Sequence, residues 1–202
     1  GGTEALSIAL RAVTKPGDVV AVESPTYFFV LQLIERLGLL AVEIRTSPET
    51  GMDVEALEEV LDFTDVRAVV AIPNFSNPLG SLMPDAEKAR LVHVLAERNI
   101  ALIEDDISGD LGFHNRRPTL AKSYDEGGRV MLCSSFSKTL APGFRVGWLA
   151  AGRYFRDALN WKQAMSASTS ALPQFVIAEF LRSGQYDQSA AQLAASYQRH
   201  IE

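Results

Sequence analysis

Short runs of β-branched and other apolar residues alternate with helix-length amphipathic stretches along most of the chain. The apolar runs predict strands at 19–22, 41–44, 68–72, 100–103, 130–133 and 146–150. Several of these runs are uninterrupted, as expected for strands that helices cover on both faces. Between them, apolar residues recur at helical spacing, for example at Leu6, Ala9, Leu10 and Val13. The alternation predicts an α/β fold with a mostly parallel sheet sandwiched by helices.

The C-terminal part of the chain has no strand pattern. From Tyr154 onward we find only helix-compatible segments, which we expect to break near Pro173 and Gly184, with a new helix after Asp187. There is no internal repeat and no flexible linker. We therefore expect one α/β domain, with its core in residues 1–151 and a helical C-terminal part in residues 152–202.

Composition limits the class of function. The chain has 202 residues, with 19 Lys and Arg against 25 Asp and Glu, so its formal charge is −6. This acidic balance argues against a nucleic-acid-binding surface, which would need a basic face. The single cysteine, Cys133, excludes a disulfide framework and a multi-cysteine metal site, and fits the reducing cytoplasm. No apolar run reaches the ~18 residues of a membrane span. With three scattered histidines, we expect no metal site.

Clusters of chemically useful residues occur at a predicted helix start and just after predicted strands. Ligands of open α/β sheets bind beyond the carboxyl ends of the strands, so these are the places to examine. The segment Gly1-Gly2-Thr3 leads straight into the first helix. Bare N–H groups at a helix start bind phosphate, although Gly-Gly before a helix is more often an ordinary turn.

A second cluster extends from Ser134 to Arg145. Lys138 follows three hydroxyl residues in a segment that is otherwise almost uncharged. The lysine could simply extend into solvent. Alternatively, its amine has a lowered pKa and forms an imine, while Ser135, Ser137 and Arg145 bind a phosphate.

Two further clusters follow apolar strands. The acidic run 104–106 is either a solvated strand end, a divalent metal site, or a place where Asp105 points inward to pair with a buried cation. The segment 73–80 contains Asn77 followed by Pro78. It is either a rigid turn or a means of fixing the Asn77 amide at the carboxyl end of the strand.

Taken together, in this order and at these separations, the four clusters resemble the fold-type I pyridoxal-phosphate enzymes, the aspartate aminotransferase superfamily. The resemblance runs from Gly1 to about Ala151, and its most specific parts are Ser-x-Ser-Lys-x-x-x-Pro-Gly-x-Arg and Asn-Pro-x-Gly. Residues 134–154 and 184–187 also look like the aminotransferase-like domains of MocR-type regulators of the GntR superfamily. In those regulators an N-terminal winged helix-turn-helix binds DNA, and none of that module is in this sequence.

The resemblance implies a role for each matched residue around pyridoxal 5′-phosphate. Lys138 would hold the cofactor covalently and transfer a proton, Asp105 would pair with the ring nitrogen, and Tyr27 would stack on the ring. Asn77 would donate to the phenolic oxygen. The phosphate would be bound by backbone N–H groups, hydroxyls and a guanidinium, from Gly2, Thr3, Ser135, Ser137 and Arg145.

The sequence departs from the family pattern in two places. Ser108 occupies the position, three residues after Asp105, at which the family usually has a tyrosine that reaches the phenolic oxygen. This puts efficient transamination in doubt more than cofactor binding. Glu4 stands where many relatives have a smaller or uncharged residue, and we expect it to face outward because a carboxylate would repel a phosphate. The resemblance also implies cis peptides at Ser24-Pro25 and Asn77-Pro78.

The resemblance leaves more than one function open. The first hypothesis is the effector-sensing domain of a MocR/GntR-type regulator, a homodimer that takes an amine or amino acid as its signal and binds DNA only through the absent module. The second is a stand-alone aminotransferase acting on an α-amino acid, of the aminoadipate or aromatic type. A domain that has lost the cofactor is disfavoured because the sequence retains Lys138, Asp105, Asn77, Tyr27 and Arg145.

Two remaining expectations concern the outer parts of the chain. The pair Arg116-Arg117 could contact a neighbouring subunit, but a solvated basic turn is the simpler interpretation. The chain starts at Gly1 without a methionine and stops in a helix-like stretch. We therefore expect a fragment that is truncated before the small domain of the family.

Overall fold

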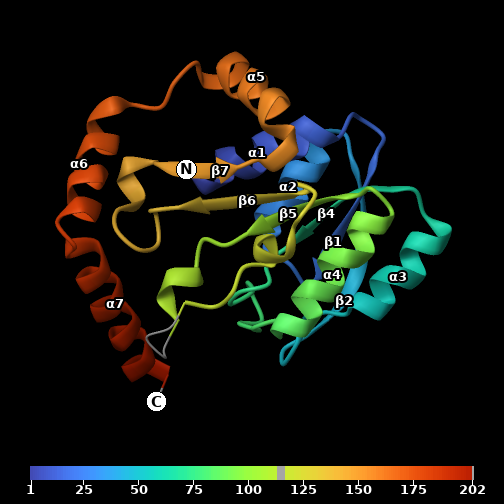
Figure 1. Cartoon of the computed structure of the whole chain (residues 1–202), viewed down its shortest axis with the longest axis horizontal. Coiled ribbons are helices and arrows are strands. Elements are labelled where there is room, and N and C mark those ends of the chain that lie inside the picture. The colour runs from blue at the N-terminus through green and yellow to red at the C-terminus, as the bar shows by residue number, and fades with distance from the viewer. Residues whose placement is uncertain (113–116, 202) are drawn as a thin grey trace.

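A computed structural model describes residues 1–112 and 117–201 of the chain. Seven strands form one sheet in the order β3-β2-β1-β4-β5-β6-β7. All neighbouring strands are parallel except the two edge pairs, β2–β3 and β6–β7. Helices cover both faces of the sheet (Figure 1). The predicted fold, a mostly parallel sheet sandwiched by helices, is confirmed.

All six predicted strands are present, with ends displaced by at most three residues. The seven strands are β1 (Val19–Ser24), β2 (Leu40–Ser47), β3 (Gly51–Met52), β4 (Val66–Ala71), β5 (Ala101–Asp105), β6 (Val130–Ser135) and β7 (Gly147–Ala150). Strand β3 was not predicted, because two residues are too few to show a hydrophobic period. It pairs antiparallel with the end of β2.

The α-helices occupy the stretches between the strands and the whole C-terminal part. They are α1 (Gly2–Val13), α2 (Phe28–Arg36), α3 (Val54–Phe63), α4 (Asp85–Glu97), α5 (Phe155–Ser166), α6 (Ala171–Arg182) and α7 (Gln185–Ile201). Short 3₁₀ turns are η1 (Gly109–Leu111), η2 (Ala121–Tyr124), η3 (Pro142–Phe144) and η4 (Gly152–Tyr154). Among the residues described, no helix is both long and apolar enough to cross a bilayer.

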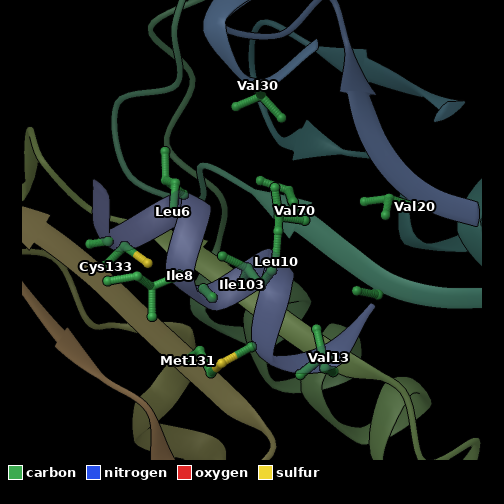
Figure 2. Close-up of a cluster of buried hydrophobic side chains, with 14 of the residues drawn as sticks. Leu6, Ile8, Leu10, Val13, Val20, Val30, Val70, Ile103, Met131 and Cys133 are labelled. Carbon is green, nitrogen blue, oxygen red and sulfur yellow. The ribbon is translucent and has the colours of Figure 1, made fainter. Parts of the chain in front are cut away.

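The core consists of two apolar layers, one on each face of the sheet. Helices α1 and α2 pack on one face, and α3 and α4 on the other. Figure 2 shows Leu6 and Leu10 of α1 gathered with Val70 of β4 and Ile103 of β5. Burial of each such side chain contributes about 1.5–3 kcal/mol. Helix α1 is thereby fixed across the sheet, with its N-terminus at the edge where the parallel strands end.

The C-terminal helices differ in detail from the sequence prediction. Pro173 lies in the first turn of α6 rather than at a break, because a proline is compatible with the first helical turn. The break occurs instead at 167–170. Gly184, with a φ of 73°, ends α6 as predicted, but α7 starts at Gln185, before Asp187. In Figure 1, α6 and α7 run along one edge of the molecule, outside the two helix layers.

Candidate active site at the carboxyl edge of the sheet

The carboxyl ends of β1, β4, β5 and β6 meet at one edge of the sheet, since these strands are parallel neighbours. Each predicted cluster is connected to this edge. Tyr27 follows β1 and Asn77 follows β4, while Asp105 is the last residue of β5. Lys138 lies in the turn after β6, and Arg145 lies just before β7. The topology therefore brings together residues that are far apart in the sequence.

The start of α1 and the Arg145 side chain are adjacent at this edge. A Cβ atom placed on Gly1 would be 2.9 Å from a guanidinium nitrogen of Arg145, and one placed on Gly2 would be 3.5 Å from the Ser135 hydroxyl. The Glu4 and Ala5 nitrogens both donate to the Gly1 carbonyl. The N–H groups of Gly2 and Thr3 therefore precede the first helical hydrogen bond, at the positive end of the helix dipole.

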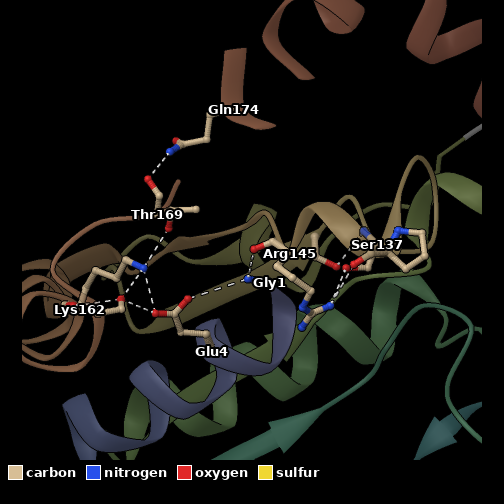
Figure 3. Close-up of polar contacts among 10 residues, drawn as sticks. Gly1, Glu4, Ser137, Arg145, Lys162, Thr169 and Gln174 are labelled. Carbon is tan, nitrogen blue, oxygen red and sulfur yellow. Dashed lines mark hydrogen bonds and ion pairs between the residues drawn. The ribbon is translucent and has the colours of Figure 1, made fainter. Parts of the chain in front are cut away.

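The loop between β6 and β7 adds further donors at the same place. Arg145 has a left-handed backbone, with a φ of 54°, and its Nη1 lies 3.4 Å from the Ser137 hydroxyl (Figure 3). The Ser137 nitrogen is in turn 3.4 Å from the Ser135 hydroxyl. Both contacts are long, so these groups are not committed to strong hydrogen bonds with one another. Together with the start of α1, they form a cradle of donors that suits an anion.

Glu4 does not oppose this cradle. Its carboxylate accepts hydrogen bonds from Lys162 Nζ at 2.9 Å and from the Ser166 hydroxyl at 2.6 Å (Figure 3). The sequence led us to expect an outward-facing Glu4, and the structure directs its carboxylate to α5. It turns toward α5 rather than freely into solvent, and the positive Lys162 neutralises its charge there.

Asp105 points into the protein at the end of β5. Its side chain is 1% exposed, and its Oδ1 has no hydrogen-bond partner among the described residues. Burial raises the pKa of Asp105 from 3.8 to about 7; a hydrogen bond from the Ile107 backbone opposes this rise, and the charge of Asp106 adds to it. The inward orientation matches the prediction. None of the residues in 1–112 and 117–201 places a cation beside this oxygen, which would suit a positively charged ligand group.

The neighbouring Asp106, and not Asp105, forms an ion pair with Arg117. The sequence alone could not show which of the two adjacent aspartates would be paired. The Asp106 carboxylate also accepts a hydrogen bond from Asn74 Nδ2 at 2.8 Å. Arg117 also donates to Asp110 from Nε at 2.7 Å. Arg117 is 37% exposed, in line with the expected solvated position, but its guanidinium also joins two acidic residues. Arg116 lies outside the described residues.

The other predicted residues, Lys138, Asn77 and Tyr27, lie near this edge of the sheet without direct contacts to one another. Lys138 is exposed and has no hydrogen bond or ion pair within the described part of the chain. Asn77 is also exposed. The peptide bonds Asn77-Pro78 and Ser24-Pro25 are cis, as predicted. Tyr27 is half-buried and stacks against Phe29 with the ring centroids 6.2 Å apart. Lys138 and Asp105 thus share an edge, but the structure does not bring them into contact.

Sequence reasoning did not identify two features of the site. Glu23, at the end of β1, is 1% exposed, and its Oε1 has no partner among the described residues, like Oδ1 of Asp105. An acidic residue that closes an apolar strand run was a usable signal for it. Tyr186 of α7 is the second feature, since its hydroxyl contacts Asp110 and Thr139. No spacing rule connects residues so far apart in sequence.

Comparison with known proteins finds one family model that matches the chain, and relatives that are regulators and aminotransferases. The family model "Aminotransferase class I and II" matches residues 1–202. The chain is 42% identical to the uncharacterized HTH-type transcriptional regulator YjiR of Escherichia coli (strain K12), over 100% of the chain and 43% of YjiR. It is 33% identical to aromatic-amino-acid aminotransferase 1 of Thermococcus litoralis, over 98% of the chain and 48% of that enzyme. The chain thus spans less than half the length of these two relatives.

Solved structures of aminotransferases have the same fold. The kynurenine aminotransferase of Pyrococcus horikoshii, solved in complex with PMP, is 31% identical with a TM-score of 0.90, over 98% of this chain and 50% of that one. LysN, the α-aminoadipate aminotransferase of Thermus thermophilus, is 28% identical with a TM-score of 0.92, over 98% of this chain and 52% of that one. The sheet and both helix layers described above are therefore common to all three proteins.

Proposed function

The chain belongs to the aminotransferase class I and II family, and on this premise we propose that it is the pyridoxal 5′-phosphate-binding part of a MocR/GntR-type transcriptional regulator. Two regulators, YjiR and YdcR of E. coli, are each 42% identical to it. The cofactor assignment depends above all on the buried Oδ1 of Asp105, which has no partner among the residues that the structure describes. A positively charged pyridinium N–H would donate a hydrogen bond to this oxygen, and the donor cradle at the start of α1 suits a phosphate.

In this proposal each residue acts on a distinct part of the cofactor, which supplies an electron sink when bound. Lys138 would hold it covalently and carry a proton, which is consistent with an exposed amine that no side chain of the described residues engages. Asp105 binds the ring nitrogen, Tyr27 packs on the ring and Asn77 donates to the phenolic oxygen. The phosphate is bound by Gly2, Thr3, Ser135, Ser137 and Arg145.

Electrostatics support this arrangement of charges. A carboxyl with a pKa of about 7 is only partly ionised at neutral pH when no cation lies beside it. A cation beside Asp105 favours its charged form, and the carboxylate in turn keeps the ring nitrogen protonated. The anionic end of the ligand lies near Arg145, whose guanidinium is beside Gly1. The cationic ring nitrogen would thus lie beside the carboxylate of Asp105, and the anionic phosphate beside the guanidinium of Arg145.

The proposal extends to the whole protein. We propose that the protein binds an amine or amino acid as its small-molecule partner. We further propose that it is a cytoplasmic homodimer, which binds DNA only through a separate helix-turn-helix module. Residues 1–151 would be the core of the cofactor domain, and residues 152–202 the helical remainder of its large domain. An aminotransferase acting on an aromatic or aminoadipate-type amino acid is the second candidate. The similarity to the T. litoralis enzyme and to LysN favours it.

Borohydride reduction of the full-length protein with added pyridoxal phosphate tests the assignment. Peptide mapping should find the cofactor on Lys138 in the wild type and nowhere in Lys138→Ala. Lys15→Ala, which removes an exposed lysine in the loop after α1, is the matched control and should keep the label. Persistent covalent labelling of Lys138→Ala would contradict the proposal.

A second measurement separates the two candidate functions. The full-length regulator should bind its own promoter DNA with an affinity that changes when an amino acid reacts at the labelled site, and it should turn over slowly or not at all. Rapid multiple-turnover transamination, with no effect of amino acids on DNA binding, would favour the aminotransferase.

A further inference from the structure

Tyr186 of α7 contacts the turn that carries Lys138 at two points. Its hydroxyl lies 2.9 Å from Oγ1 of Thr139, the residue directly after the lysine. Its ring meets that of Phe136 edge to face, with the centroids 5.8 Å apart. Tyr186 is 8% exposed and Thr139 is 3% exposed, whereas Lys138 is exposed. The Tyr186 side chain thus contacts Phe136, two residues before the lysine, and Thr139, directly after it.

The protonation of this cluster fixes the direction of each hydrogen bond. Burial raises the pKa of Tyr186 to about 12, so the phenol keeps its proton at neutral pH. The Asp110 carboxylate, 2.7 Å away, can only accept, so the phenol donates to it. The phenol oxygen must then accept the hydroxyl proton of Thr139. Thr139 thus has one specific partner for its buried hydroxyl.

The same cluster reaches the strand end that carries Asp105. Asp110 is paired with Arg117, which is paired in turn with Asp106. The Asp106 nitrogen donates to the Cys133 carbonyl at 2.9 Å, and the Ser134 hydroxyl donates to the Asp106 carbonyl at 2.9 Å. A continuous series of hydrogen bonds and ion pairs therefore links Thr139, beside the lysine, to Asp106, beside the buried carboxyl.

We propose that Tyr186 is a positioning residue, which holds the turn bearing Lys138 in a fixed place relative to the end of β5. The proposal rests on the proposed function, in which Lys138 and Asp105 bind opposite sides of one cofactor. Helix α7 is remote from both residues in sequence and lies outside the helix layers. A displacement of α7 would therefore release the lysine turn, and would alter covalent capture of the cofactor without changing any group that touches it.

Hydrogen exchange in the cofactor-free, full-length protein tests the hold on the turn. The Leu140 and Ala141 amides both donate to the Phe136 carbonyl at 3.0 Å, so they report on the turn. In Tyr186→Phe the ring remains and only the hydroxyl is lost. We expect exchange of the 136–141 peptide to accelerate about fivefold, the effect of losing the hydrogen bond to Thr139. The hydrogen bond to Asp110 is lost in the same variant. Tyr197→Phe is the matched control on the same helix, since Tyr197 is 45% exposed, and it should exchange like the wild type.

The rate at which pyridoxal phosphate is captured covalently is the second readout. We expect it to fall about fivefold in Thr139→Val and at least as far in Tyr186→Phe, which also loses the hydrogen bond to Asp110. The double variant should fall no further than Tyr186→Phe, because both changes remove the same Tyr186–Thr139 contact. A Tyr186→Phe protein with wild-type exchange and wild-type capture would overturn the proposal. If Tyr186→Phe fails to fold, Thr139→Val decides by the same two measurements.

The two proposals fail in different ways. If the wild type does not capture pyridoxal phosphate, the proposed function is wrong, while exchange of the 136–141 peptide still shows whether Tyr186 holds the turn. Normal capture by the wild type, with Tyr186→Phe indistinguishable from it, would leave the proposed function intact and refute the positioning role alone.

Discussion

Replacement of Asp105 with asparagine should stabilise the cofactor-free protein at neutral and alkaline pH, even though this carboxylate is central to the proposed site. The side chain is buried, and its Oδ1 has no partner among the described residues. Ionising it there is costly, which is why its pKa rises from 3.8 to about 7. Asparagine has a similar shape, can still accept the Ile107 hydrogen bond and carries no charge.

The magnitude follows from the difference between the two pKa values of Asp105. The folded state favours the protonated carboxyl, so its stability falls as the pH rises from about 4 to about 7 and then levels off. The interval between 3.8 and about 7, at about 1.4 kcal/mol per pH unit, corresponds to about 4 kcal/mol. Burial also raises the pKa of Glu23 to about 7, and the charge of Asp105 adds to this rise. Removing the Asp105 charge therefore acts in the same direction at Glu23.

Urea unfolding of the cofactor-free, full-length protein measures this effect. The stability advantage of Asp105→Asn over the wild type should grow by about 2–3 kcal/mol between pH 5 and pH 8. Asp65→Asn, which removes an exposed carboxylate, is the control and should show no such growth. Pyridoxal phosphate should stabilise the wild type more than Asp105→Asn, because only the carboxylate pairs with a cation. An advantage that stays constant or reverses over this pH range would refute the reasoning.

Three further changes test the donor cradle and the ion pair beside it. Arg145→Ala should weaken pyridoxal phosphate binding by about 1.5–3 kcal/mol in a fluorescence titration, and unchanged affinity would place the phosphate elsewhere. Gly147→Ala should destabilise the protein by about 1–3 kcal/mol, because its Cβ would lie 2.7 Å from the Gly1 carbonyl carbon; Gly143→Ala, with open space around it, should be neutral in the same thermal scan. Asp106→Ala should cost about 3 kcal/mol in urea unfolding, at the low end for a buried pair because Arg117 is 37% exposed, and a neutral result would contradict the pairing.

The sequence was informative about the fold because local signals were strong. Apolar runs marked the strands of the parallel sheet, and the parallel topology then required Asn77, Asp105 and Lys138 to reach one edge. A strand buried on both faces must be apolar wherever it lies in the sheet, so its composition alone identifies it. The two-residue β3 and the start of α7 lacked such a signal, and they were missed or misplaced.

The identities of the matched residues were also enough to indicate the cofactor. Lys138, Asp105 and Arg145 have chemistry that an ordinary surface loop does not require, and their order along the chain matches one family. The separations of these three residues in the sequence could be read directly. The environment of each side chain could not be predicted, because its burial and pairing depend on which segments pack against it.

Tertiary structure alone decided how the charges are distributed. Adjacent aspartates at 105 and 106 look equivalent in the sequence. Within residues 1–112 and 117–201, however, Asp106 pairs with Arg117, while one oxygen of Asp105 has no partner. Tyr186 reaches Thr139 only because α7 folds back along the sheet edge. Hydrophobic periodicity is a property of a short segment, so it can be recognised in the sequence. An ion pair or a hydrogen-bonded buried hydroxyl needs a partner from a distant segment, which only the folded chain brings within reach.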